Sequence, residues 1–88
     1  MVNMDINEKI KTFGEALKNR LDSSLIDFAL EYIDFSENVL AFETLCGHIA
    51  NYQVRISPEE YRQVLDIAGQ LEIDNQYSDI DPLRNLLK

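Results

Sequence analysis

Residues 6–35 read INEKIKTFGEALKNRLDSSLIDFALEYIDF, and their apolar positions recur with the period of an α-helix. In the first half the apolar residues are four, three, four and four positions apart: Ile6, Ile10, Phe13, Leu17 and Leu21. This spacing places one apolar face on a first helix. The Asp-Ser-Ser run at 22–24 interrupts the period and offers N-cap residues for another helix. The stretch therefore predicts two consecutive helices.

The second of these helices, roughly Ser24 to Phe35, is the most apolar part of the chain. Well over half of its circumference is apolar: Leu25, Ile26, Phe28, Ala29, Tyr32 and Ile33. A helix of this kind is covered on two sides, so we expect it at the centre, with Leu25, Phe28 and Tyr32 in the core. The narrow remainder carries Asp27, Glu31 and Asp34, which we name the acidic strip. Its like charges repel one another, and no base within the helix relieves them.

Helical spacing continues through most of the remaining chain. A third helix is predicted from about Glu37 to Tyr52, with these residues inward: Val39, Phe42, Leu45, Cys46, Ile49 and Tyr52. Residues 53–56 read as loop or extended chain. Ser57-Pro58-Glu59-Glu60 predicts a capping box and a fourth helix to about Leu71, with these residues inward: Tyr61, Val64, Leu65, Ala68 and Leu71. Residues 72–80 read as polar and irregular, and Asp81-Pro82 begins a last short helix.

The length and these periods predict one all-α domain over residues 1–88. We expect a compact bundle of about four helices plus a short C-terminal helix. Phe42, Ile49 and Leu65 are expected in its core. Gly14 and Gly69 fall inside helices, where the usual reason for a glycine is close helix packing.

Acidic residues outnumber basic ones, sixteen to eight, and give a net charge of −8. Between Arg20 and Arg55 there are six acids and no Lys or Arg. Nucleic acid and anionic membranes both need a basic footprint, so neither is expected as a partner. The acids favour either a basic protein partner or a solvated surface that keeps the chain soluble.

Few residues are available for chemistry. His48 and Cys46 are the only histidine and the only cysteine, and they point to opposite sides of the third helix. They cannot supply a zinc site, so we expect no metal, no cofactor and no enzyme activity, with His48 on the surface and Cys46 a small buried apolar residue. One cysteine, no apolar secretory segment at the start and no membrane-length apolar run predict a cytoplasmic protein.

Four segments together resemble a known family: GEALKNRLDSSL at 14–25, ALEYID at 29–34, LAFETLC at 40–46 and ISPEEY at 56–61. Their order and spacing, over about residues 10–72, are similar to the MafI family of bacterial immunity proteins, whose relatives serve in contact-dependent growth inhibition. The resemblance implies an antitoxin that binds and neutralises a toxin domain of its own cell, commonly a nuclease such as an EndoU-like RNase. The family often has an acid after the Leu-Cys pair, where this chain has Gly47.

A nuclease active site is basic because it must attract RNA, so an acidic helix face can occupy it. We therefore predict that the partner-binding residues are the acidic strip with two further acids: Asp27, Glu31, Asp34, Glu37 and Glu43. A rival site is the second acidic segment near Tyr77, with Asp74, Asp79 and Asp81. An acidic adaptor or subunit that binds another basic protein remains the alternative, and a small enzyme ranks third for want of a nucleophile–base pair. The oligomeric state of the free chain stays open.

Overall fold

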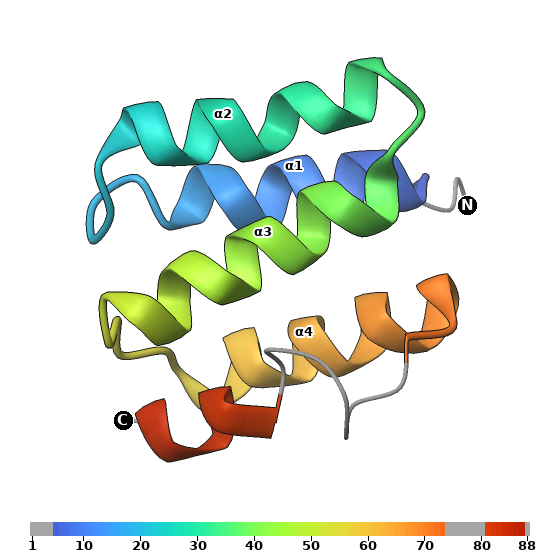
Figure 1. The fold of residues 1–88 in the computed structure, drawn as a ribbon. Coiled ribbons are helices and arrows are strands. Elements are labelled where there is room, and N and C mark those ends of the chain that lie inside the picture. The colour runs from blue at the N-terminus through green and yellow to red at the C-terminus, as the bar shows by residue number, and fades with distance from the viewer. Residues whose placement is uncertain (1–4, 74–80, 88) are drawn as a thin grey trace.

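The computed structural model describes residues 5–73 and 81–87. Within these residues, four α-helices and one 3-10 helix form a bundle: α1 Ile6–Ala16, α2 Ser23–Asp34, α3 Asn38–Asn51, α4 Pro58–Leu71 and η2 Asp81–Leu86. α2 lies on one side of the molecule, α1 and α3 lie in the middle, and α4 and η2 lie on the opposite side (Figure 1). An isolated parallel bridge joins Ile56 to Leu87 in this otherwise helical arrangement. The predicted all-α bundle is confirmed.

The helix starts follow the local sequence signals. Asp22 caps α2, because its Oδ1 accepts a hydrogen bond of 2.9 Å from the backbone N–H of Ser24. The capping box of α4 is present as predicted: the backbone N–H of Glu60 donates to Ser57 Oγ at 3.1 Å, and that of Ser57 donates to Glu60 Oε1 at 2.8 Å. Pro58 occupies the first turn, where its missing N–H costs nothing.

The helix ends differ from the sequence prediction at one place. α1 ends at Ala16 instead of continuing to Leu21. Leu17 and Leu21 are nevertheless buried, because a tight turn in which Leu21 N donates to Leu17 O keeps both facing inward. After α2, α3 and α4 the chain turns through a left-handed residue: Ser36, Gln53 and Glu72 with φ of 60°, 51° and 59°. In each case two backbone bonds close the helix end in the Schellman pattern, with a non-glycine residue where glycine is usual.

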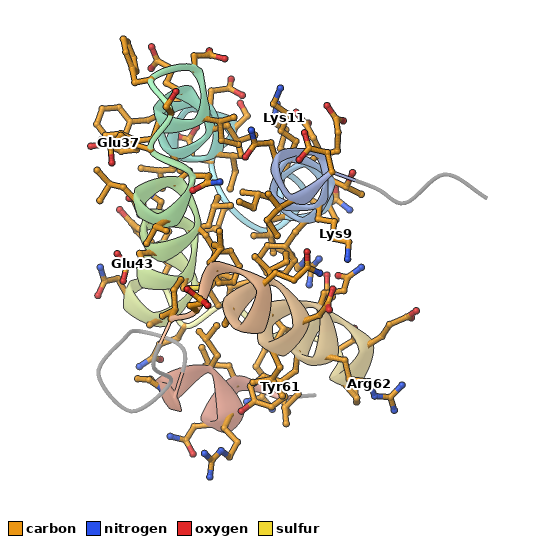
Figure 2. All side chains as sticks on the ribbon, turned by 90° about the vertical axis from the view of Figure 1, so that its right-hand side faces the viewer. Lys9, Lys11, Glu37, Glu43, Tyr61 and Arg62 are labelled. Atoms are coloured by element: carbon orange, nitrogen blue, oxygen red, sulfur yellow. The ribbon has the colours of Figure 1, made fainter. Side chains whose placement is uncertain are left out.

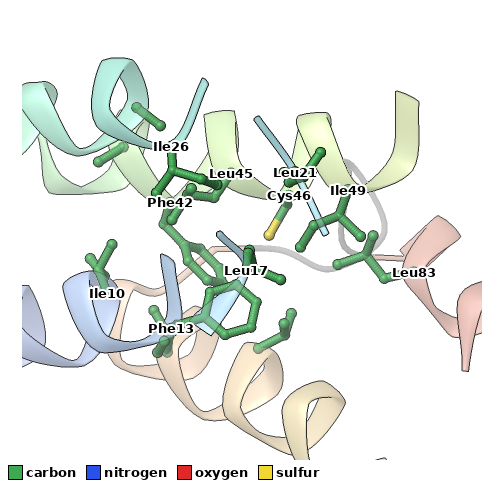
Figure 3. Packing of buried hydrophobic residues seen from close by; sticks show 14 of the residues in the cluster. Ile10, Phe13, Leu17, Leu21, Ile26, Phe42, Leu45, Cys46, Ile49 and Leu83 are labelled. Carbon is green, nitrogen blue, oxygen red and sulfur yellow. The ribbon is translucent and has the colours of Figure 1, made fainter. Parts of the chain in front are cut away.

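The core lies around α3, which packs against α2, α1 and η2. Phe42 of α3 is fully buried, and its ring centroid is 6.1 Å from that of Phe13 on α1. Further buried side chains from α1, the α1–α2 connection, α2, α3 and η2 belong to the same cluster (Figure 3): Ile10, Leu17, Leu21, Ile26, Leu45, Cys46, Ile49 and Leu83. The predicted core positions Phe42 and Ile49, and the buried Cys46, are confirmed.

α3, and not α2, occupies the centre of the bundle, so several predicted core positions are wrong. α2 buries a single face, Ile26, Ala29 and Ile33, against α1 and α3. Its outer face is open, which leaves Phe28 57% exposed, whereas Leu25 and Tyr32 are half-buried. Three further residues expected inside are not buried: Val39 is 38%, Leu65 37% and Tyr52 61% exposed.

The two helical glycines have different surroundings. A Cβ placed on Gly14 would lie 3.3 Å from Leu30 Cδ2 and 3.4 Å from Leu45 Cδ1, so three helices meet closely there, as predicted. A Cβ on Gly69 would meet no atom within 4 Å, so close packing was the wrong explanation for that residue. Among the described residues, no helix is both long enough and apolar enough to cross a bilayer.

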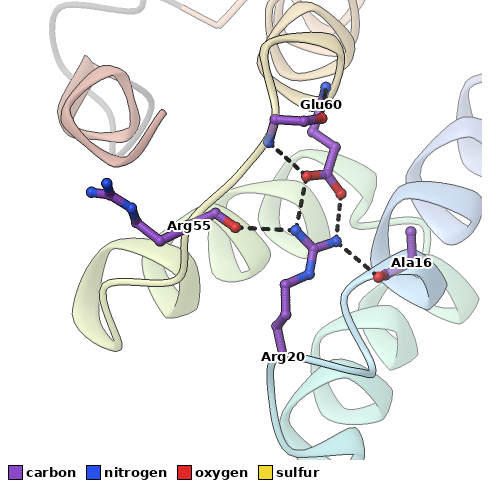
Figure 4. A network of polar contacts seen from close by, with 5 residues as sticks. Ala16, Arg20, Arg55 and Glu60 are labelled. Carbon is purple, nitrogen blue, oxygen red and sulfur yellow. Dashed lines mark hydrogen bonds and ion pairs between the residues drawn. The ribbon is translucent and has the colours of Figure 1, made fainter. Parts of the chain in front are cut away.

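Arg20 joins two parts of the chain that are distant in sequence, the end of α1 and the segment 55–60 (Figure 4). Its Nη1 donates to Glu60 Oε1 at 2.8 Å and to the Arg55 carbonyl at 3.1 Å, while Nη2 donates to Glu60 Oε2 and to the Ala16 carbonyl. This bidentate pair ties the α1–α2 connection to the start of α4. The Arg20 guanidinium is the main reason that the pKa of Glu60 falls to about 2.

Candidate functional site

The acidic strip lies along the side of α2 that borders α1. Asp27, Glu31 and Asp34 are all exposed, and they line a groove between the two helices. α1 contributes Lys11 and Glu15 to the same groove. The structure thus brings the three predicted strip residues together, but beside Lys11 of the neighbouring helix.

Lys18 changes the electrostatics of the strip. Its Nζ lies 2.9 Å from Asp27 Oδ1 and 3.1 Å from Glu15 Oε2. These contacts raise the pKa of Lys18, with the hydrogen bond to Asp27 as the largest cause and that to Glu15 next. The base that neutralises the charge of Asp27 lies in the α1–α2 connection, outside α2. The residues of α2 alone therefore did not reveal it. Asp27 is therefore partly committed to the fold.

Glu31 and Asp34 remain available to a partner. Neither has an ion pair within residues 5–73 and 81–87. Both lie in the last turn of α2, which contains no base. The C-terminal end of a helix carries partial negative charge, so acids there are unfavourable by a few tenths of a kcal/mol each. These two acids lie where the helix alone would favour cations.

Glu37 and Glu43 do not extend the groove. Figure 2 places both on the side of the molecule away from Lys9 and Lys11 of α1. Glu37 is exposed in the α2–α3 turn, and Glu43 is half-buried on α3 beside Leu40 and His48. The five predicted partner-binding residues thus form one group of three and two separate positions. Among the rival residues, Asp74, Asp79 and Tyr77 lie outside the described residues, as does the side chain of Asp81.

Cys46 and His48 occupy unlike environments. Cys46 is fully buried. His48 is half-buried, its ring centroid lies 6.4 Å from that of Tyr52, and its Nε2 is enclosed without a hydrogen-bond partner. The prediction of an ordinary surface histidine is therefore wrong for that nitrogen. In the part of the chain that the structure describes, no three His, Cys, Asp or Glu side chains gather in an arrangement that could hold a metal ion.

Exposed aromatic side chains next to the strip were missed in the sequence. Phe28 is 57% and Phe35 72% exposed, and the rings of Phe28 and Tyr32 meet edge-on with centroids 5.8 Å apart. The three residues, which we name the aromatic ridge, line a shallow cleft together with Glu31. Their spacing of four and three residues, which places them on one helix face, was a signal for the ridge. Phe28 and Tyr32 were instead expected in the core, because apolar residues usually face inward.

Comparison of the chain with protein-family models, curated proteins and solved structures gives no match. The resemblance to the MafI family therefore stays a prediction. The geometry offers an exposed surface on α2 in which two acids without an ion pair to any described residue adjoin two exposed phenylalanines. Such a surface can bind a protein with complementary charge.

Proposed function

We propose that this chain is a cytoplasmic immunity protein that binds and neutralises a basic bacterial toxin domain, by resemblance an EndoU-like RNase. The observation that supports this proposal most is the position of Glu31 and Asp34. They are exposed and unpaired among the described residues, at the helix end where negative charge is unfavourable. A partner lysine or arginine would relieve this repulsion, and the protein would gain affinity where the free helix loses stability.

Charge also suits the task of an antitoxin. Free toxin is harmful, so capture must be fast, and opposite charges raise association rates toward roughly 10⁸ M⁻¹s⁻¹. The net charge of −8 gives the whole chain an attraction for a basic domain. The α2 acids would then direct the approach to one face.

Copurification tests the proposal. The chain, carrying an affinity tag, is expressed together with the catalytically inactive C-terminal domain of a toxin encoded beside its gene. We expect the two to elute as one complex. Absence of a neighbouring toxin gene, together with a place in an operon of unrelated cellular genes, would instead favour the acidic adaptor, because the same α2 surface fits another basic protein.

Neutralising the two unpaired acids should separate binding from folding. We expect the double variant Glu31→Gln/Asp34→Asn to be as stable as the wild type or slightly more stable, because it removes acids from the C-terminal turn of α2. Its association with the toxin domain should be roughly three- to tenfold slower at low salt, with a weaker dependence on salt. Stopped-flow mixing over a salt series measures both effects.

A matched control changes the net charge by the same amount on the opposite side of the molecule. Glu59→Gln/Glu72→Gln removes two exposed acids from α4 and the residue that follows it. This variant should associate at nearly the wild-type rate. Equal slowing in both variants would mean that total charge matters and that α2 has no special role.

A further inference from the structure

The two phenylalanines of the aromatic ridge contribute little to the core of this protein, whereas Tyr32 packs against it. Phe28 and Phe35 expose 57% and 72% of their surface, and neither belongs to the buried cluster around α3. Polar residues at these positions would keep the fold and improve solubility. Large aromatic side chains that project next to one another from a helix are typical of protein interfaces, where they act as anchors in a partner's pocket.

The ridge has a defined shape. The edge-on contact at 83° between Phe28 and Tyr32 restrains both rings. Tyr32 is half-buried, so one side of this pair is held by the protein while Phe28 projects outward. Phe35 follows at the end of α2, where the Ser36 turn ends the helix: the N–H of Glu37 donates to the Tyr32 carbonyl at 2.9 Å. Restrained aromatic side chains lose little entropy on binding.

Charge decides what can cover the ridge. Glu31 lines the same cleft as the three aromatic residues, and Asp34 and Glu37 are exposed immediately before and after Phe35 and Ser36. A second copy of this chain packed ridge to ridge would bring these acids from both copies into one interface, and like charges meeting there cost several kcal/mol. A surface with an apolar recess and a rim of Lys or Arg complements both features.

We propose that Phe28 and Phe35 insert into an apolar recess of the basic toxin domain, with Tyr32 along its edge and Glu31 bonded to a base on its rim. This inference rests on the proposed function and assigns different tasks to two groups of residues. The aromatic ridge holds the complex together and sets its dissociation rate. The acids Glu31 and Asp34 set the association rate.

The test uses the catalytically inactive toxin domain encoded beside this gene, immobilised for surface plasmon resonance. The ridge variant is Phe28→Ala/Phe35→Ala, and the matched control is Tyr52→Ala/Leu65→Ala, which removes two other exposed side chains, one from the C-cap of α3 and one from α4. We expect the ridge variant to bind about 100-fold more weakly, almost entirely through faster dissociation. The control should bind within about threefold of wild type. Thermal melting of both variants confirms that they are folded.

Two results would overturn the ridge as an anchor and leave the proposed function standing. One is a ridge variant that binds like the wild type, and the other is a loss of affinity that lies entirely in association. If the wild-type chain does not bind the toxin domain at all, the proposed function fails and this inference fails with it. Sedimentation of the free chain adds a further check: dimers that the ridge variant abolishes would show that a second copy covers the ridge.

Discussion

Replacing Phe42 with alanine should lower the free energy of unfolding by about 3–5 kcal/mol, the usual cost of emptying an aromatic site in a core. Phe42 is fully buried, contacts Phe13 and lies on the central helix α3, so several elements lose contacts together. A domain of 88 residues has a stability of roughly 4–13 kcal/mol. The variant should therefore lose a large part of its stability, and urea denaturation measures the loss.

Phe28→Ala is the matched comparison, since it removes the same side chain from an exposed position on α2. We expect it to cost well under half as much as Phe42→Ala, because only its contact with Tyr32 and part of its surface are lost. A Phe28→Ala variant that is as unstable as Phe42→Ala would mean that α2, and not α3, is the centre of the bundle.

Acid should weaken the protein through the pair of Arg20 and Glu60. In the folded chain the pKa of Glu60 is about 2, against an ordinary value of 4.5, and its side chain is only 15% exposed. A pKa that is lowered on folding stabilises the protein fully above the unfolded value and loses this contribution as pH falls through the folded value. The loss therefore occurs between about pH 4.5 and pH 2. The fall of this pKa from 4.5 to about 2 corresponds to roughly 3–4 kcal/mol, which screening by solvent at this partly exposed pair reduces to roughly 2–3 kcal/mol.

The variant Glu60→Gln isolates this contribution. At pH 7 it should be less stable than the wild type by roughly 2–3 kcal/mol, because Arg20 loses its charged partner. The difference should shrink toward zero as the pH falls to 2, since the wild-type carboxylate is then protonated as well. Glu59→Gln, at the exposed neighbouring acid in the same helical turn, should change stability little at either pH. A Glu60→Gln penalty that stays constant from pH 7 to pH 2 would contradict the assigned role of the ion pair.

Local signals in the sequence predicted the helices well. The period of the apolar residues found four helices, and the Ser57 capping box fixed the start of α4 at Pro58. The end of α1 was misplaced because Leu17 and Leu21 continue the apolar spacing while the backbone has already left the helix. Both side chains reach the core through a turn, which periodicity alone does not distinguish from a helix.

The environment of α2 could not be predicted from its own residues. A helix that is apolar over more than half of its circumference is either covered on two sides or covered on one side with an open binding face. Phe28 fits both arrangements in sequence, and only the packing of α3 at the centre separates them. The residues proposed to anchor a partner therefore lie on α2, the helix that its apolar residues predicted to be covered on two sides.

Contacts between different segments of the chain could not be predicted from the sequence either. The acidic strip was recognised, but the approach of Lys18 to Asp27 depends on how α1 and α2 pack. Glu60 was recognised as a capping residue, while its stronger partner Arg20 lies 40 residues earlier. Glu31 and Asp34 lie together in the groove, where their binding of a partner stays a prediction, and Glu37 and Glu43 lie away from them.

We propose that this chain inhibits a nuclease toxin by binding it, and a titration of RNase activity measures this inhibition. The active form of a toxin domain found to be encoded beside the gene is held at a fixed concentration with a fluorogenic RNA, and the purified chain is added in steps. Our account predicts that activity falls linearly to zero at one chain per toxin domain. Full RNase activity in the presence of a tenfold excess of the chain would contradict it.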